Sequence, residues 1–200
     1  MTAQTRSRKR GSVTVFSIFL ALFSVATGRA AETTTFWIEP CSVMIASCDA
    51  GDGDLARWAL AAWETASAGR LHFAETKDRA SALLRVLWAD KNSGLYGEAV
   101  SILVNGRRGS ELHILVPEQN PKDPLLRATI VYLTCLHESG HALGLPHTRA
   151  FPDIMYSFQF GGDIDEYFGR YRRLLSTRED IRKNPGMSPA DRAALLERIR

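Results

Sequence analysis

The sequence predicts a single α+β domain. Three observations lead to this class: strand-like segments dominate the first part of the chain, helical periodicities dominate the last part, and one helical segment separates the first strand from the second. No internal repeat and no long linker divides the 200 residues. The composition, with 45% hydrophobic and 24% charged residues, is that of a globular chain and excludes disordered, collagen-like and disulfide-rich classes.

Two strands and a helix are expected in the first part of the domain. The β-branched and aromatic residues at 34–38 predict the first strand. Apolar residues recur at helical spacing over 55–66, where Trp58 and Trp63 are expected to be core anchors. The alternating residues at 71–75 predict the second strand.

Three more strands are expected to complete the sheet. The continuous apolar run at 82–88 is typical of a central strand. The segments 99–104 and 111–116 flank the connection Asn105-Gly106-Arg107-Arg108-Gly109, whose Asn-Gly is a strong hairpin signal. The position of 99–104 in the chain favours it as an edge strand.

The remaining segments are predicted to be helical. The run 125–143 predicts one long helix that ends at Gly144. Apolar residues at helical spacing over 164–175 predict a second helix. A third is expected after Ser188, because an N-cap serine is followed there by a proline at the first helical position and an acid at the third.

Residues 1–30 have the pattern of a secretory signal peptide. Basic residues precede a mostly apolar run over 13–26, which is shorter than the roughly 20 residues of a membrane span. Small residues favour cleavage after Ala30, with Gly28 as the second choice. We expect 31–200 to be secreted or periplasmic, with no stable membrane span after cleavage; an uncleaved N-terminal anchor is the alternative.

The formal net charge of +3 is unevenly distributed. Residues 1–30 hold five basic and no acidic side chains, so the totals of 25 basic and 22 acidic leave 20 and 22 for 31–200, a net charge of −2. A nucleic-acid-binding domain would be basic as a whole, so we expect no nucleic-acid partner. The Arg-rich stretch 170–182 is interpreted as a solvated helix face, with a surface for an acidic partner as the alternative.

The three cysteines are interpreted as one pair and one free thiol. Cys41 and Cys48 bracket a short loop and can pair in an oxidising compartment, with three free thiols as the alternative. Cys135 lies in an apolar helical run and is expected to be a buried small hydrophobe.

Chemistry is concentrated in the pattern H-E-x-x-H-x-x-G-x-x-H, which begins at His137. Residues four apart lie on one helix face, so His137 and His141 can bind one metal ion. Gly144 allows the chain to turn back and to bring His147 as a third ligand. Three nitrogen ligands leave one tetrahedral position open, as in catalytic zinc sites. Glu138 can contact a water molecule there without being a ligand.

The segment from His137 to His147 resembles the zinc signature of the metzincin metallopeptidases. Met155 resembles their Met-turn, and Thr148 after the third histidine is similar to the residue that matrixins carry there. The resemblance covers about residues 34–200, strongly at the motif and by element order elsewhere. It implies a metzincin-like single domain with a mixed, twisted five-stranded sheet, an active-site helix and a smaller helical C-terminal part.

The resemblance implies a secreted zinc-dependent endopeptidase with one catalytic Zn²⁺ bound by His137, His141 and His147. Glu138 would act as general base on a zinc-activated water molecule. A polypeptide substrate is expected to bind as an extended strand along 99–104. The wall of the main side-chain pocket would come from about 153–160. Its aromatic residues, Tyr156, Phe158 and Phe160, indicate an apolar preference.

The sequence departs from the matrixins in two ways. Animal matrixins carry a propeptide cysteine that caps the zinc, for which 31–40 leaves no room. Cys41 as a thiolate cap is an alternative that the disulfide opposes. The segment 91–101 lacks the histidine of a structural zinc loop, so a single zinc is predicted. Structural Ca²⁺ would be compatible with the resemblance, but no acidic cluster specifies it.

Other side chains near the motif are expected to have structural roles. His72 and His113 are predicted on the sheet surface or core rim rather than as ligands. Met155 is expected to form a packing floor under the ligand imidazoles. Tyr156 is expected to pack below the zinc, with a hydrogen bond near the substrate as the alternative.

Two functions compete with the endopeptidase. One is a secreted zinc-binding module without proteolytic turnover, which the presence of Glu138 disfavours. The other is an anchored surface protein with a structural zinc, which the open fourth ligand position disfavours. The oligomeric state expected by default is a monomer.

Overall fold

Five strands form one sheet in the computed structural model, which describes residues 32–41, 47–89 and 96–200. The sheet order is β2-β1-β3-β5-β4, with parallel neighbours except for the antiparallel pair β4 and β5. The mixed sheet, the central place of β3 and the edge position of β4 confirm the predictions. The strands are β1 (Glu32–Ile38), β2 (Leu71–Glu75), β3 (Leu84–Ala89), β4 (Gly97–Val104) and β5 (Arg107–Leu115).

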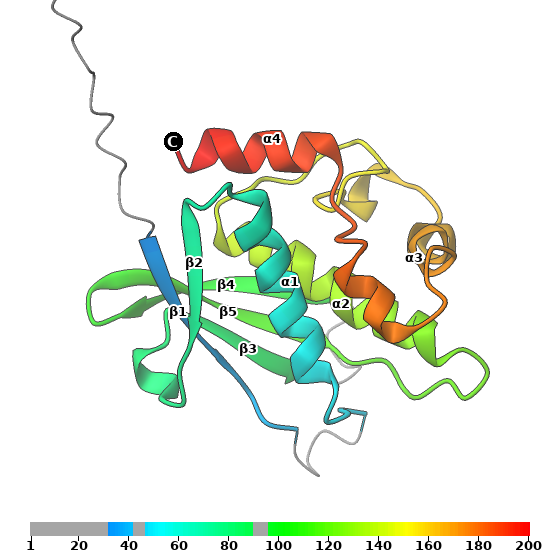
Figure 1. The fold of residues 1–200 in the computed structure, drawn as a ribbon, viewed down its shortest axis with the longest axis horizontal. Coiled ribbons are helices and arrows are strands. Elements are labelled where there is room, and N and C mark those ends of the chain that lie inside the picture. The colour runs from blue at the N-terminus through cyan, green and yellow to red at the C-terminus, as the bar shows by residue number, and fades with distance from the viewer. Residues whose placement is uncertain (1–31, 42–46, 90–95) are drawn as a thin grey trace, which may run out of the picture.

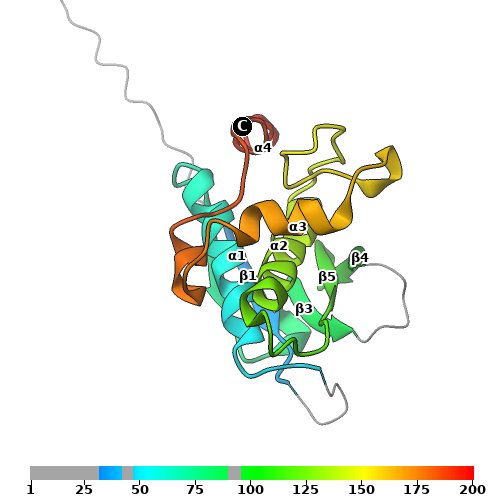
Figure 2. The ribbon, with the colours of Figure 1, turned by 90° about the vertical axis from the view of Figure 1, so that its right-hand side faces the viewer.

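Two long helices lie side by side against this sheet (Figures 1 and 2). They are α1 (Asp52–Ala66), in the crossover between the parallel strands β1 and β2, and α2 (Pro124–Ala142). The smaller C-terminal part holds α3 (Ile164–Arg172), the 3-10 turn η4 (Arg178–Arg182) and α4 (Pro189–Arg198). The α+β class is therefore confirmed, as are the predicted helices, although α3 ends three residues before the buried Leu175.

The contact between α1 and α2 depends on one of the two predicted tryptophan anchors. Trp63 is fully buried, and its indole Nε1 donates to the Leu136 carbonyl at 2.9 Å and to Ser139 Oγ at 3.0 Å. The prediction for Trp58 is confirmed only in part: its ring is partly buried against the core and also lies under the Arg178 guanidinium. Five residues of helix turn the chain by about 140°, so the two rings cannot face the same side.

The hairpin between β4 and β5 is tighter than predicted. Asn105 and Gly106 both have positive φ, 51° and 78°, and form a two-residue turn. Pairing therefore begins at Val104 and Arg107. Strand β5 starts four residues before the predicted 111, because its first residues are polar and lack the apolar signal of a strand.

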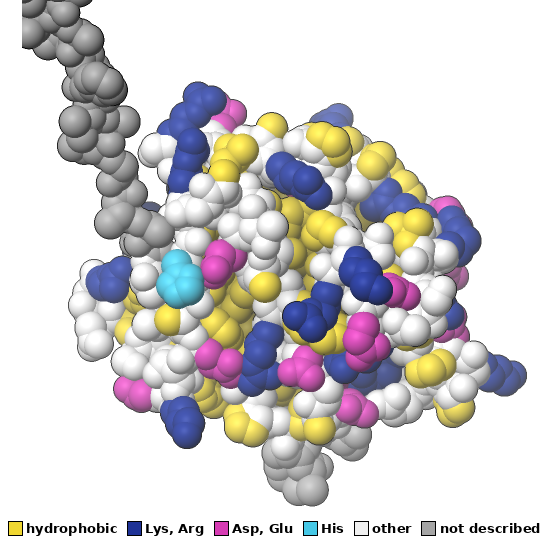
Figure 3. Space-filling model, in the orientation of Figure 1, with side chains coloured by type: hydrophobic (Ala, Val, Ile, Leu, Met, Phe, Trp, Pro, Cys, Tyr) yellow, Lys and Arg dark blue, Asp and Glu magenta, His cyan; other side chains and the backbone are white. Residues whose placement is uncertain are grey.

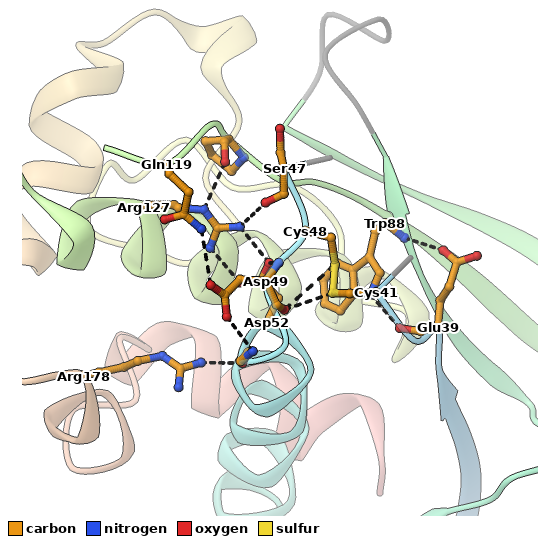
Figure 4. Close-up of a disulfide and its surroundings, with 12 residues drawn as sticks. Glu39, Cys41, Ser47, Cys48, Asp49, Asp52, Trp88, Gln119, Arg127 and Arg178 are labelled. Atoms are coloured by element: carbon orange, nitrogen blue, oxygen red, sulfur yellow. Dashed lines mark hydrogen bonds and ion pairs between the residues drawn. A yellow bond between two sulfur atoms is a disulfide. The ribbon is translucent and has the colours of Figure 1, made fainter. Parts of the chain in front are cut away.

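A disulfide joins Cys41 to Cys48 between β1 and α1 (Figure 4). Beside it, the buried Arg127 guanidinium binds Asp52 through two 2.7 Å contacts and donates to the Ser47 carbonyl at 2.6 Å. Breaking such a buried pair costs about 3–5 kcal/mol, so this corner fixes α2 to the start of α1. The pairing excludes Cys41 as a thiolate cap in the oxidised protein.

The third cysteine and the predicted signal peptide are separate from this corner. Cys135 is free and buried, as predicted, and burial raises the pKa of its thiol. The predicted signal peptide at 1–30 lies outside the described residues. Among those residues, no helix has the length and apolar character that crossing a membrane requires.

Candidate metal centre

Helix α2 and the turn after it bring three histidines together. His137 and His141 lie one turn apart, with their Nε2 atoms 3.1 Å from each other. Gly144, at a φ of +84°, reverses the chain after the helix. His147 then places its Nε2 at 3.2 Å from that of His137 and 3.0 Å from that of His141.

The other ring nitrogens fix the tautomers of two of these histidines. Nδ1 of His137 lies 2.6 Å from the Ile154 carbonyl oxygen, and Nδ1 of His141 lies 2.9 Å from that of Leu145. A carbonyl only accepts, so each Nδ1 carries the proton and each neutral ring has its lone pair on Nε2. Two lone pairs that face each other at 3.1 Å repel, and a cation between them removes that repulsion.

The three nitrogens fit a zinc ion. A triangle with sides near 3.1 Å has its centre about 1.8 Å from each corner, so a point just off its plane lies at the roughly 2.0–2.1 Å of a zinc–nitrogen bond. Burial lowers the pKa of His137 to about 4 and also lowers that of His147, so both rings are neutral at pH 7. The arrangement is compatible with a zinc site formed by His137, His141 and His147.

Glu138 lies beside this group and is held close to the edge strand. Its side chain is 5% exposed and lines the same cavity as the histidines. Burial, together with the charge of Glu98, raises the pKa of Glu138 to about 7. A Cβ at Gly97 would lie 2.6 Å from Thr134 Cγ2 and 2.7 Å from Glu138 Cγ, so only glycine lets β4 approach α2 here.

Asp191 supports the floor of the centre, a role that the sequence analysis missed. Met155 is 1% exposed and its sulfur packs against Gly140 of α2, as expected of a packing floor. The Asp191 carboxylate accepts from the Ile154 amide at 2.9 Å and from the Met155 amide at 3.4 Å. Because the Ile154 carbonyl orients His137, Asp191 positions that ligand indirectly.

A cavity of about 710 Å³ opens beside the histidines. Residues 97–99 of β4 and residues 156–159 both line it. Apolar side chains from α2 and α3 line the cavity, among them Leu133, Tyr167 and Phe168. The cavity thus offers an apolar pocket next to the candidate metal ligands.

The predicted aromatic wall is only partly present. Phe158 lines the cavity. Phe160 does not: its side chain is 40% exposed and lies under the Arg149 guanidinium, because the short 3-10 turn directs it away. Tyr156 also lines the cavity; it is buried and donates from its hydroxyl to the Gly161 carbonyl at 2.5 Å.

The remaining candidates do not join the centre. His72 lies on β2 with Nδ1 3.2 Å from Glu64, and His113 lies on β5 with Nε2 4.0 Å from Glu111. Cys41, Cys48 and Asp52 form the other group of metal-binding residue types found in the described part of the chain. The disulfide makes the two sulfurs unavailable as thiolate ligands.

Neither a family model nor a curated protein matches this chain. The interpretation of the centre therefore depends on its own donor set and geometry. Three histidine nitrogens converge, a buried carboxylate lies next to them, and an open apolar cavity adjoins both.

Proposed function

We propose that the chain is a zinc-dependent endopeptidase of the metzincin type, close to the matrixins. The observation that carries the proposal is the convergence of His137, His141 and His147, with Glu138 beside them in an open cavity. A structural zinc would have a fourth protein ligand, and the described residues provide none in this group.

In peptide hydrolysis, the histidines would bind the metal and Glu138 would transfer a proton. The three histidines hold the ion, which when bound supplies a Lewis acid and lowers the pKa of a water molecule. The Glu138 carboxylate accepts a proton from the attacking water and returns it to the leaving amine. Gly97 leaves room for that carboxylate beside β4, in the wall of the cavity.

The substrate would be an unfolded polypeptide segment. Strand β4 ends the sheet order, so its outer edge has no partner among the described strands. An extended peptide can add to that edge through main-chain hydrogen bonds, with residues 156–159 on its other side. The lining by Leu133, Tyr167 and Phe168 favours an apolar substrate side chain in the cavity.

The first test compares the purified protein, expressed from its full sequence, with Glu138→Ala on a mixture of unfolded proteins. Both proteins are brought to the same zinc content, and His72→Ala serves as a control outside the centre. We expect cleavage by the wild type and by the control, and none by Glu138→Ala. If none of the three cleaves while all bind one zinc, the chain is a binding module or an enzyme of narrow specificity, and general proteolysis is rejected.

Export is also part of the proposal. N-terminal sequencing of the protein recovered outside the cytoplasm should begin at Ala31, after cleavage at Ala30. A protein that keeps residues 1–30 and stays with the membrane would support the uncleaved anchor instead.

A further inference from the structure

A second groove lies on the face of the molecule that is drawn in Figure 3, which is the face where α1 is seen in Figure 1. Its volume is about 430 Å³, and it lies between α1 and the segment that leads from η4 to α4. Hydrophobic side chains line this hollow and Lys and Arg side chains border it (Figure 3). The apolar lining includes Trp58, Ala62, Tyr132, Ile181 and Met187.

The groove is distinct from the candidate metal centre. Helix α2 contributes Tyr132 to the groove and Thr134 to the cavity beside the histidines. Two residues of helix rotate the chain by about 200°, so these side chains point to opposite sides of α2. A ligand in the groove would not touch the metal-binding histidines.

The first part of the Arg-rich stretch is engaged within the molecule. Arg172 binds Asp123 at 2.8 Å, and Arg173 binds Glu166 at 2.5 Å. The Arg170 guanidinium lies 4.5 Å from the centre of the Tyr167 ring. These arginines therefore do not form a free basic surface.

Three further basic groups border the groove. Arg182, Lys183 and Arg192 all line it and are exposed. Lys183 pairs with Asp180 at 3.1 Å, and the Arg182 guanidinium lies 5.9 Å from the centre of the Trp58 ring. The Arg192 side chain has no ion pair within the described part of the chain. The rim is therefore net positive above an apolar floor.

We propose that this groove binds an acidic segment of a partner polypeptide. An apolar side chain of that segment would enter the hollow, and carboxylates on either side would pair with Arg182, Lys183 and Arg192. The groove is lined by exposed residues of both α1 and α4, so it is open to solvent. An open groove favours an extended peptide lying along it over a small ligand enclosed in it. The proposal does not depend on proteolysis.

Other polyanions fit the groove less well. Three cations are few for a nucleic acid, which binds through many phosphate contacts. The guanidinium groups of Arg178 and Arg182 already lie over the Trp58 ring, so a stacking base would compete with them. The large hydrophobic side chains that are exposed elsewhere on the chain are not in the groove, and a flat bilayer would not reach a recessed floor.

The test measures binding of a labelled peptide in which Glu alternates with Phe and Leu. The full chain carries Glu138→Ala, so that the probe is not cut. Fluorescence anisotropy is recorded for this protein, for a version with Arg182→Glu and Arg192→Glu, and for a control with Arg108→Glu and Arg200→Glu. The two versions change the net charge equally. A further variant, Ala62→Trp, fills the groove without changing its charge.

We expect the groove pair and Ala62→Trp each to lose affinity about tenfold or more, and the control pair to change it less than about twofold. Urea unfolding of every variant shows whether the fold is retained. The proposal is overturned if no binding occurs, or if both charge pairs weaken binding equally. It is also overturned if a peptide with Gly in place of Phe and Leu, a single-stranded oligonucleotide or an anionic vesicle binds as tightly at the groove.

Discussion

Replacing Asp191 should weaken both the fold and zinc binding. Its carboxylate is 2% exposed and accepts from the amides of Ile154 at 2.9 Å and Ser188 at 2.8 Å, with a longer bond from Met155. A hydrogen bond to a charged group contributes roughly 1.5–3 kcal/mol. Asp191→Ala removes two short ones and leaves buried donors unpaired, so the free energy of unfolding should fall by about 3–5 kcal/mol.

The effect on the metal should follow from the Ile154 carbonyl, which orients the His137 ring. Loss of an outer-shell partner lowers zinc affinity roughly 10–100-fold. Asp191 contacts His137 only through Ile154, so we expect zinc affinity to fall about tenfold, at the lower end of this range. Asp191→Asn keeps one acceptor oxygen and should lose about 1–3 kcal/mol, which leaves a folded protein for the metal measurement.

Urea unfolding and zinc competition with a chromophoric chelator measure the two effects. The matched control is Asp163→Ala, which removes a single exposed cap bond to the Glu166 amide and should cost about 0.5–1 kcal/mol with no change in zinc affinity. If Asp191→Asn and Asp191→Ala behave like this control in both assays, the carboxylate does not support the ligand and the reasoning is refuted.

Three further predictions concern the edge strand, the metal and acid pH. Gly97→Ala should lower proteolysis roughly tenfold or more at unchanged zinc content, because the added Cβ displaces Glu138; unchanged peptide cleavage would contradict this. Chelation of the metal should abolish cleavage but leave the circular dichroism spectrum, since one continuous hydrophobic core, to which the sheet, α1 and α2 all contribute, holds the fold; unfolding would instead support a structural zinc. Backbone amides, that of Thr177 foremost, lower the pKa of Asp180 to about 2, so its contribution to stability is complete above about pH 4. The difference in urea midpoint between wild type and Asp180→Asn should therefore shrink as the pH falls from about 4 to 2, and a constant difference would exclude this linkage.

Local sequence signals predicted most elements and the ligand group. His137, His141 and His147 follow from helix periodicity and one turn, which involve only neighbouring residues. The central and edge positions of β3 and β4 also followed from apolar continuity and chain order. These features could be predicted because each depends on residues that are close together in the sequence.

Features that depend on distant contacts were not predicted. The bond from the Ile154 amide to Asp191 spans 37 residues, and the capping pattern at 188–191 indicated only a helix start. The partial exposure of Trp58 and the outward position of Phe160 have a similar cause, because hydrophobicity indicates burial but not which side of a helix or turn faces the core. Gly97 gave no signal, since its role is the approach of another element.

The hydrogen bonds from the Ile154 and Met155 amides to Asp191 also have a consequence for how the centre forms during synthesis of the chain. The ribosome has added all three histidines, Ile154 and Met155 before it reaches Asp191. The carboxylate that accepts from the Ile154 and Met155 amides is added 36 residues after Met155. A nascent chain that ends at Met155 therefore lacks the Asp191 carboxylate, which holds the segment whose Ile154 carbonyl orients the His137 ring. The centre would therefore reach its full affinity for the metal only after α4 has docked.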